Sequence, residues 1–348
     1  MPWTNLVADQ QISRSGLEGF SEGQRRITYG QAVAEAMTQA MVLDQSVITL
    51  GQGVDAAGYV YDTTKGLSER FGKERVVETP IAEAAITGLA LGAAITGLRP
   101  ILVHMRNDFI LVSMDQIVNH IAHWQKLFPT ERGVPLVIRG IVARGWGSGA
   151  QHSQSFHALF SGLSGLKVVM PTTPYDVKGM LLGAVASNEP VLFLEHRWLY
   201  GDEGYVPEEP YALPLNKSIL RQEGKDLTIV AVSLANRFAK MAMAEETKET
   251  GITADLIDLC SINPLDLEPI CKSVCKTGRL LIVEDGPITC GIGAEISAQV
   301  TEECWGNLKK PVLRVGWPGS SVPAGTKMEE HFYPGISEIR HGIMRLLK

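Results

Sequence analysis

The chain has 348 residues, which at roughly 150 residues per domain predicts about two domains. Lys and Arg total 32 against 38 Asp and Glu, a net charge of −6 without a long basic run, and this balance argues against a nucleic-acid partner. The five Cys form no pair of CxxC motifs, and no uninterrupted apolar run reaches about 18 residues, so we expect a cytoplasmic protein without a zinc site, a disulfide framework, a secretion signal or a membrane-spanning helix.

The first domain is expected over residues 27–200, after a polar and irregular N-terminal arm over residues 1–26. Hydrophobic periodicity predicts helices over 28–43 and 113–127, and a third that begins at Thr172-Thr173-Pro174, where a Thr N-cap precedes a Pro in the first turn. Short apolar segments predict strands over 46–50, 75–78, 99–104, 135–143, 166–170 and 190–196. Strands and helices therefore alternate, which predicts a doubly wound, mainly parallel α/β sheet with helices on both faces.

A second, smaller α/β domain is expected over residues 216–348. The periodicity stops between 200 and 215, where Gly and Pro accumulate, so residues 201–215 are the predicted linker. After it the pattern predicts strands over 226–233, 253–259, 279–284 and 312–315, and helices over 235–248, 265–275, 292–303 and 336–347. The second domain should therefore be doubly wound as well.

Glu83 is the first candidate for chemistry. It follows a predicted strand and the pair Thr79-Pro80, which we expect to cap and begin a helix, so it falls at the carboxyl edge of the sheet, where open α/β sheets bind ligands. The alternative is a Glu that only complements the helix dipole. The helix that follows is rich in Ala and Gly, so another backbone can approach closely around Glu83, which favours the functional interpretation.

His152 is the second candidate. Gly145, Gly147 and Gly149 follow the strand over 135–143 and permit a tight, open loop that delivers the imidazole to the same edge of the sheet. A structural or solvated His is the alternative, and His157, one helical turn further on, is a weaker rival.

Two other stretches are less specific. Phe109 follows the strand that ends near Met105, and its ring serves either the core or a flat wall for an aromatic ligand. Gly291-Ile292-Gly293 lacks the third glycine of a dinucleotide fingerprint and the Lys of a Walker loop, so we interpret it as close helix packing.

Seven motifs in chain order resemble the β subunits of thiamine diphosphate dependent 2-oxo acid dehydrogenase E1 components, such as pyruvate and acetoin dehydrogenase. They are GlyXGlyVal near residue 51, LysGlyLeu at 65–67, ThrProIleAlaGlu at 79–83, GlyLeuArgPro at 97–100, AspGlnIleValAsn at 115–119, GlnHisSerGln at 151–154 and GlyLeuLysValValMetPro at 165–171. The resemblance runs from about Ile27 to the C-terminus. It implies a transketolase-type pyrimidine-binding domain followed by a transketolase C-terminal domain.

The resemblance also implies roles for individual side chains. Glu83 matches the Glu that hydrogen-bonds the N1′ atom of the cofactor's aminopyrimidine, and His152 matches a His that faces the thiazolium side and handles the 2-oxo acid or its adduct. The positions expected beside the cofactor are Gln52, Ile81, Met105 and Phe109. Some members hold potassium through main-chain carbonyls, and the matching positions are Leu136, Ala184, Val185, Ser187 and Glu189.

One family motif is missing from the chain. Thiamine diphosphate enzymes fix Mg²⁺ and the diphosphate with a GlyAspGly motif and a later Asn, whereas this chain has only Gly201-Asp202-Glu203. The diphosphate and Mg²⁺ should therefore bind to a separate α chain, which implies an α2β2 heterotetramer with a second β subunit.

The leading hypothesis is an E1 β subunit that, with its α subunit, oxidatively decarboxylates a 2-oxo acid and passes the acyl group to the lipoyl arm of an acyltransferase (E2). Gln52 stands where many members carry an acidic residue, Arg106-Asn107 departs from the usual context, and Val322-Pro323-Ala324 replaces ThrProTyr or ThrProPhe. These departures leave open a two-chain decarboxylase, acyloin synthase or transketolase-like enzyme of a specialised pathway. A non-catalytic scaffolding subunit is the third hypothesis, and the presence of Glu83 and His152 argues against it.

Overall fold

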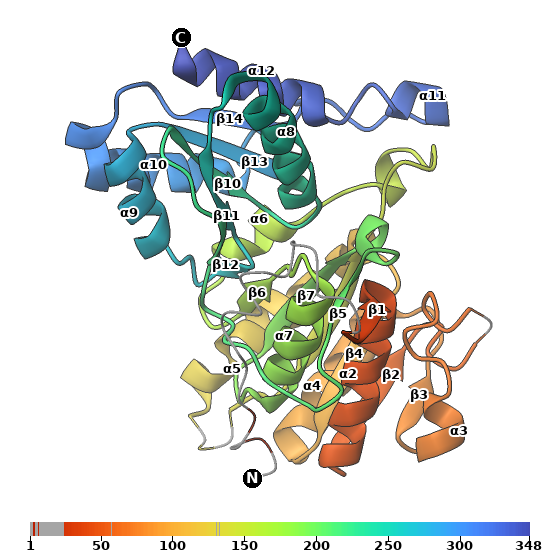
Figure 1. Cartoon of the computed structure of the whole chain (residues 1–348). Helices are drawn as coiled ribbons and strands as arrows, with labels where there is room; N and C mark the ends of the chain where they lie inside the picture. Colours follow the sequence, from red (N-terminus) through yellow and green to blue (C-terminus); the bar gives the residue numbers. More distant parts are fainter. Residues whose placement is uncertain (1–2, 4–5, 7–23, 57, 130, 132) are drawn as a thin grey trace. The chain divides into compact units, whose positions relative to one another are not determined.

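The structure is a computed structural model that describes Trp3, Leu6 and residues 24–56, 58–129, 131 and 133–348 (Figure 1). The chain divides into an N-terminal unit, Met1–Val142 with Gly162–Leu215, and a C-terminal unit, Ala143–Ser161 with Asn216–Lys348. The predicted arm over residues 1–26 lies almost entirely outside the described residues. No helix in the described part of the chain is long and apolar enough to cross a membrane.

The N-terminal unit is built on a parallel sheet with the strand order β6-β7-β5-β4-β2-β3. The strands are β2 (Val47–Gly51), β3 (Val76–Glu78), β4 (Arg99–His104), β5 (Val137–Val142), β6 (Lys167–Val169) and β7 (Val191–His196). All residues of β4, β5 and β7 are buried, which is typical of parallel strands covered on both faces. The predicted doubly wound α/β arrangement is confirmed.

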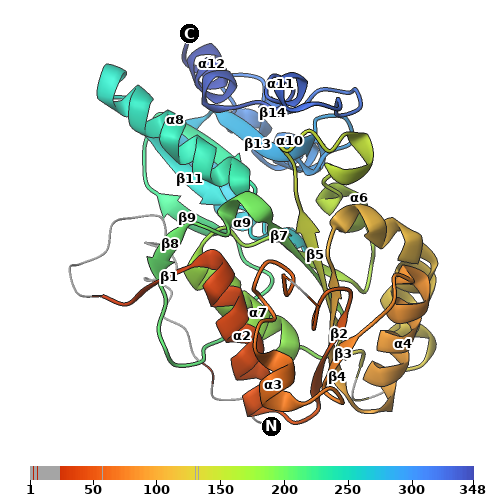
Figure 2. The ribbon, with the colours of Figure 1, turned by 90° about the vertical axis from the view of Figure 1, so that its right-hand side faces the viewer.

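Helices cover both faces of this sheet. Figure 2 shows α2 (Tyr29–Leu43) and α7 (Pro174–Ala186) on one side and α4 (Glu83–Thr96) on the other. The N-cap predicted before Pro174 is confirmed, since the Thr173 hydroxyl accepts from the Asp176 N–H at 3.1 Å; at α2, Thr28 forms a capping box with Gln31. The remaining elements are α3 (Leu67–Phe71), a 3₁₀ turn η4 (Arg197–Leu199) and the antiparallel pair β1 (Arg26–Thr28) and β8 (Glu203–Tyr205).

The helix predicted over residues 113–127 is present as a continuous helical segment over 114–127, but it is not α-helical throughout. It follows a 3₁₀ helix η1 (Asn107–Ser113), and within it a π-helix η2 (Gln116–Ile121) precedes the α-helix α5 (Ala122–Leu127). Ile117 and Ile121 are buried, as the apolar spacing of the segment predicts. Periodicity alone does not distinguish a π-helix from an α-helix over so short a segment.

The C-terminal unit has a five-stranded sheet in the order β14-β13-β10-β11-β9, parallel except for β9. The strands are β9 (Ile219–Gln222), β10 (Leu227–Ala231), β11 (Ala254–Asp258), β13 (Leu280–Pro287) and β14 (Leu313–Trp317), and β12 (Ser261–Asn263) follows β11. The helices are α8 (Leu234–Thr250), α9 (Glu268–Thr277), α10 (Ile292–Cys304), α11 (Thr326–Glu329) and α12 (Ile336–Leu347), with a 3₁₀ turn η5 (Trp305–Asn307). The predicted second α/β domain is therefore present.

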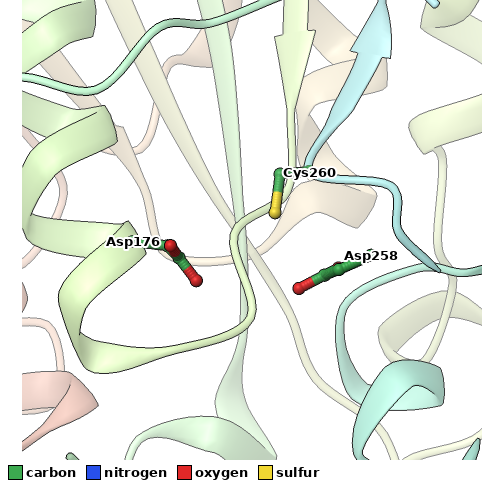
Figure 3. Close-up of side chains that lie close together, drawn as sticks. All are labelled: Asp176, Asp258 and Cys260. Atoms are coloured by element: carbon green, nitrogen blue, oxygen red, sulfur yellow. The ribbon is translucent and has the colours of Figure 1, made fainter. Parts of the chain in front are cut away.

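A buried ion pair ties the edge strand β9 to this sheet. The acidic partner is Asp258, the last residue of β11. Figure 3 shows its side chain together with that of Cys260, two residues further along the chain. The Arg221 guanidinium, from β9, donates to the Asp258 carboxylate at 2.7 and 3.0 Å. β9 is thereby held by side chains as well as by its antiparallel backbone pairing.

The segment Ala143–Ser161 leaves the first sheet at the end of β5 and belongs to the C-terminal unit. It carries a 3₁₀ turn η3 (Ala150–His152) and a short helix α6 (His157–Ser161). Sequence periodicity does not predict that this segment belongs to the C-terminal unit, because in the sequence it lies between two strands of the N-terminal sheet, β5 and β6.

Candidate active site

Three parallel strands of the N-terminal unit end side by side. Gly51, the last residue of β2, pairs with Glu78 of β3 and with Val103 of β4. The Thr79 N–H donates to the Gly51 carbonyl at 3.0 Å, which holds the two strand exits together. The residues that follow these strands therefore share the carboxyl edge of the sheet, where open α/β sheets bind ligands.

Glu83 lies at this edge as the first residue of α4, and it is 8 % exposed. The N-cap is Ala82 and its side chain makes no capping bond, so the expectation that Thr79 and Pro80 cap and begin the helix is wrong. The first N–H groups of α4 consequently have no side-chain cap at Ala82, and a carboxylate in this first turn is favoured by the helix dipole.

Buried polar atoms without hydrogen-bond partners surround the same edge. Within the described part of the chain, the Gln52 Nε2, Thr79 Oγ1 and His104 Nδ1 atoms have no partner. A buried polar group without a hydrogen-bond partner lowers the stability of the fold by about 1–3 kcal/mol. Several such groups in one place therefore indicate a binding site where a polar ligand supplies the hydrogen bonds. One buried carboxyl with donors and acceptors around it fits a flat heteroaromatic ring that carries both donor and acceptor nitrogens.

His104, at the end of β4, contacts the helix α4 that Glu83 begins. Its Nε2 atom lies 3.3 Å from the Thr87 hydroxyl, which donates to the Ser113 hydroxyl at 3.0 Å. Burial lowers the pKa of His104 to about 4, and the Glu83 carboxyl offsets only part of this shift. His104 is therefore neutral at physiological pH, and it presents no positive charge to the candidate site.

Replacing His104 by Gln should change how the free energy of unfolding depends on pH. The pKa of His104 in the folded protein, about 4, is below the unfolded value of about 6.5, so the neutral imidazole contributes stability above pH ~6.5 that is lost as the pH falls toward 4. The wild type should lose about 3 kcal/mol more than the Gln variant over this range. Denaturant unfolding at several pH values measures the difference, and parallel pH profiles would contradict it.

The other residues expected beside the cofactor lie on nearby segments of this unit. Met105 follows β4 and packs against Gly53, where an added Cβ would lie 3.3 Å from its Cε atom. The Glu78 carboxylate accepts from the Gly53 N–H at 2.7 Å and shapes the loop after Gln52. Phe109, in η1, is half-buried, whereas Ile81 is 82 % exposed.

His152 lies in η3, in the segment that belongs to the C-terminal unit, and it is half-buried. The backbone N–H of His152 donates to the Gly149 carbonyl at 3.2 Å. The three glycines before it, Gly145, Gly147 and Gly149, have φ values of 92°, 70° and 75°, so the prediction of a tight glycine loop before this His is confirmed. Glu83 and His152 are therefore carried by different units.

Four of the five carbonyls expected to hold potassium already accept hydrogen bonds. The Arg99 guanidinium donates to the Val185 and Ser187 carbonyls at 2.9 Å each. The Leu136 carbonyl accepts from the Val191 N–H and the Ala184 carbonyl from the Ser187 N–H, while the exposed Glu189 carboxylate pairs with Lys167. A buried guanidinium beside two of these carbonyls disfavours a second cation, so potassium binding here stays a prediction and no step of the mechanism depends on it.

The chain matches two family models over most of its length. The transketolase pyrimidine-binding domain matches residues 25–203, and the transketolase C-terminal domain matches residues 216–339. A split-gene transketolase, solved as an inactive β4 tetramer, superimposes with a TM-score of 0.74 at 22 % identity, over 92 % of this chain and 98 % of that one. This likeness concerns the fold.

Curated relatives are similar over nearly their whole length. The β subunit of the acetoin:2,6-dichlorophenolindophenol oxidoreductase of Cupriavidus necator is 40 % identical, over 93 % of this chain and 98 % of the relative. The β subunit of the 2-oxoisovalerate dehydrogenase of Bacillus subtilis is 38 % identical over 92 % and 98 %, and the mitochondrial pyruvate dehydrogenase E1 subunit β-1 of Arabidopsis thaliana is 38 % identical over 92 % and 89 %. The chain therefore belongs to the family of transketolase-type E1 β subunits of 2-oxo acid dehydrogenases.

Proposed function

We propose that this chain is the β subunit of a thiamine diphosphate dependent 2-oxo acid dehydrogenase. The observation that carries the proposal is the buried Glu83 carboxyl in the first turn of α4, at a sheet edge where the Gln52, Thr79 and His104 side chains hold unpaired polar atoms. Such a site is suited to a polar heteroaromatic ring, and the family relatives named above act on 2-oxo acids or acetoin.

Glu83 would activate the cofactor by sharing a proton with the ring nitrogen of its aminopyrimidine. When bound, thiamine diphosphate supplies an acidic carbon that adds to the 2-oxo group and accepts the electrons released on decarboxylation. A carboxyl both donates and accepts a proton, whereas an amide cannot exchange one. Gln52, Ile81, Met105 and Phe109 would line the pyrimidine ring, and the exposed Ile81 would be covered in the process.

His152 would handle the 2-oxo acid and the transfer of the acyl group to a lipoyl acceptor. It follows three glycines with positive φ, it is half-buried, and an imidazole can donate or accept a proton. The residue is proposed for substrate handling and not for activation of the cofactor.

Replacing His152 by Ala should lower acyl transfer to a lipoyl domain by about 100-fold, since a positioned acid or base contributes about 10²–10⁴-fold. Reduction of an artificial electron acceptor should fall less, because that assay omits the lipoyl step. Replacement of His341, exposed on α12, is the matched control. Equal losses in both assays would contradict the assigned role.

An α subunit should complete each active site. The chain lacks the GlyAspGly motif for Mg²⁺ and the diphosphate. Leu89 and Val112, in addition to Ile81, expose apolar side chains in the N-terminal unit, and such exposure supports a subunit contact. The assembly is proposed to be an α2β2 heterotetramer with Mg²⁺ bound by the α chains, working with a lipoyl-bearing E2.

The function is tested with the chain co-purified with its α subunit. Thiamine diphosphate and Mg²⁺ are added, and a panel of 2-oxo acids is assayed for decarboxylation with an artificial acceptor and with a lipoyl domain. Decarboxylation that requires both subunits supports the proposal, and failure with every 2-oxo acid contradicts it. Acyloin or aldehyde products without lipoyl acylation would instead identify a two-chain decarboxylase or acyloin synthase, the alternative suggested by Gln52.

A further inference from the structure

The glycine loop before His152 is fixed by a buried carboxylate from far along the chain. Glu329, the last residue of α11, is 0 % exposed. Its Oε1 atom accepts from the Gly145 N–H at 2.6 Å, and its Oε2 atom accepts from the Gly147 N–H. The two oxygens therefore hold alternate N–H groups of one loop, in a manner that a side chain with a single acceptor oxygen cannot reproduce.

Backbone contacts reinforce this arrangement. The Gly325 N–H donates to the Gly147 carbonyl at 3.2 Å, and Ser148 forms an isolated antiparallel bridge with Ala324. A Cβ atom on Gly147 would lie 2.8 Å from the Thr326 backbone nitrogen. The loop and the segment that contains Glu329 are thus packed backbone to backbone, in a register that only glycine permits at residue 147.

Side chains on either side of the carboxylate hold it in place. The Tyr333 hydroxyl donates to Glu329 Oε1 at 2.8 Å, and the Arg144 guanidinium lies 4.0 Å from the Tyr333 ring centroid. The Arg144 guanidinium also forms an ion pair with the Asp285 carboxylate at 2.9 Å and donates a hydrogen bond to it at 3.1 Å. The Tyr333 ring therefore connects Arg144, at the start of the loop, to the Glu329 carboxylate.

The far end of the same segment is held by the buried His157, which packs closely against β13. His157, 0 % exposed, has its Nδ1 atom 2.9 Å from the Ser155 hydroxyl and its Nε2 atom 3.6 Å from the Glu284 carboxylate. A Cβ atom on Gly286 would lie 2.7 Å from the His157 ring, so β13 packs closely against this imidazole. His152 thus lies between two anchored positions, Gly147 and His157.

We propose that Glu329 is a positioning residue for His152: its carboxylate sets the conformation of the glycine loop and thereby the place of the imidazole. The inference rests on the proposed function for the part that His152 plays in catalysis. The anchoring itself depends only on contacts within the C-terminal unit.

The test is Glu329→Gln in the complete α–β complex. One loop N–H would then face an amide donor instead of an acceptor, so exchange of the Gly145 and Gly147 amide hydrogens should speed up by about tenfold or more. The kcat for acyl transfer should fall by about 10- to 100-fold with a smaller change in KM, because displacement of a catalytic group by about 1 Å costs up to about 100-fold. Glu330→Gln, exposed and adjacent, is the matched control.

A double-mutant cycle distinguishes positioning from general stabilisation. If Glu329 acts through His152, the Glu329→Gln change should lower kcat no further in the His152→Ala background. Additive losses would overturn the positioning role, and unchanged amide exchange would overturn the anchoring itself. If His152→Ala alone has no effect, the proposed function of His152 fails, while the exchange measurement still decides whether Glu329 holds the loop.

Discussion

Replacing Glu83 by Gln should abolish most of the decarboxylation activity of the complex, with a loss of about 10²–10⁴-fold in kcat. The amide preserves the shape of the side chain and fits the buried site, but it cannot exchange a proton with a ring nitrogen. The measurement is 2-oxo acid decarboxylation with an artificial electron acceptor at saturating thiamine diphosphate, so that weaker cofactor binding does not account for the loss.

The matched control is Glu69→Gln, an exposed Glu in the first turn of α3. Both variants should unfold near the wild-type temperature and assemble with the α subunit. Glu83→Asp should also be impaired, because the carboxyl is one methylene short. Decarboxylation by Glu83→Gln near the wild-type rate would show that Glu83 does not carry this proton.

Much of the fold could be predicted because local signals and tertiary packing agree. The strands β4, β5 and β7 are short apolar runs buried on both faces, and periodicity marks them clearly. Thr173 is the N-cap of α7, at the helix start where the Thr-Pro pair predicts a cap. The glycines before His152 required a left-handed loop, and the structure has one.

Other features depend on contacts that no local pattern encodes. Four consecutive residues, Tyr59–Asp62, have φ values between 39° and 65°, a left-handed conformation that costs non-glycine residues roughly 1–2 kcal/mol each. The Thr64 N–H donates to the Tyr59 carbonyl at 3.1 Å and closes this turn. Nothing in these side chains predicts it, so tertiary packing must select it.

Part of the candidate site was also hidden in the sequence. Glu329 and Tyr333 are far from His152 along the chain, and only the folded C-terminal unit brings them to the glycine loop. His104 is the last residue of β4, whose sequence is mostly apolar. The contact of His104 with Thr87 depends on the packing of α4 against β4. Long-range pairs of this kind leave no periodic signal.

A buried ion pair inside the first sheet has no local sequence signal for the same reason. Arg139 of β5 and Glu195 of β7 are both 0 % exposed, and the guanidinium donates to the carboxylate at 2.6 and 2.9 Å. The Tyr200 hydroxyl donates to the same carboxylate at 2.7 Å, and Arg139 also donates to the Thr63 hydroxyl at 3.2 Å. The pair therefore links the centre of the sheet to the segment that follows the left-handed turn.

Replacing Glu195 by Gln should lower the free energy of unfolding of the N-terminal unit by about 3–5 kcal/mol, because the Arg139 guanidinium would remain buried without a counter-charge. Urea unfolding followed by fluorescence measures the loss. Glu203→Gln, in the exposed Arg26–Glu203 pair, should cost about 1 kcal/mol or less. The double variant Arg139→Met with Glu195→Gln should be more stable than Glu195→Gln alone, since it removes the uncompensated charge. A Glu195→Gln protein as stable as the wild type would show that the Arg139 charge is neutralised in some other way.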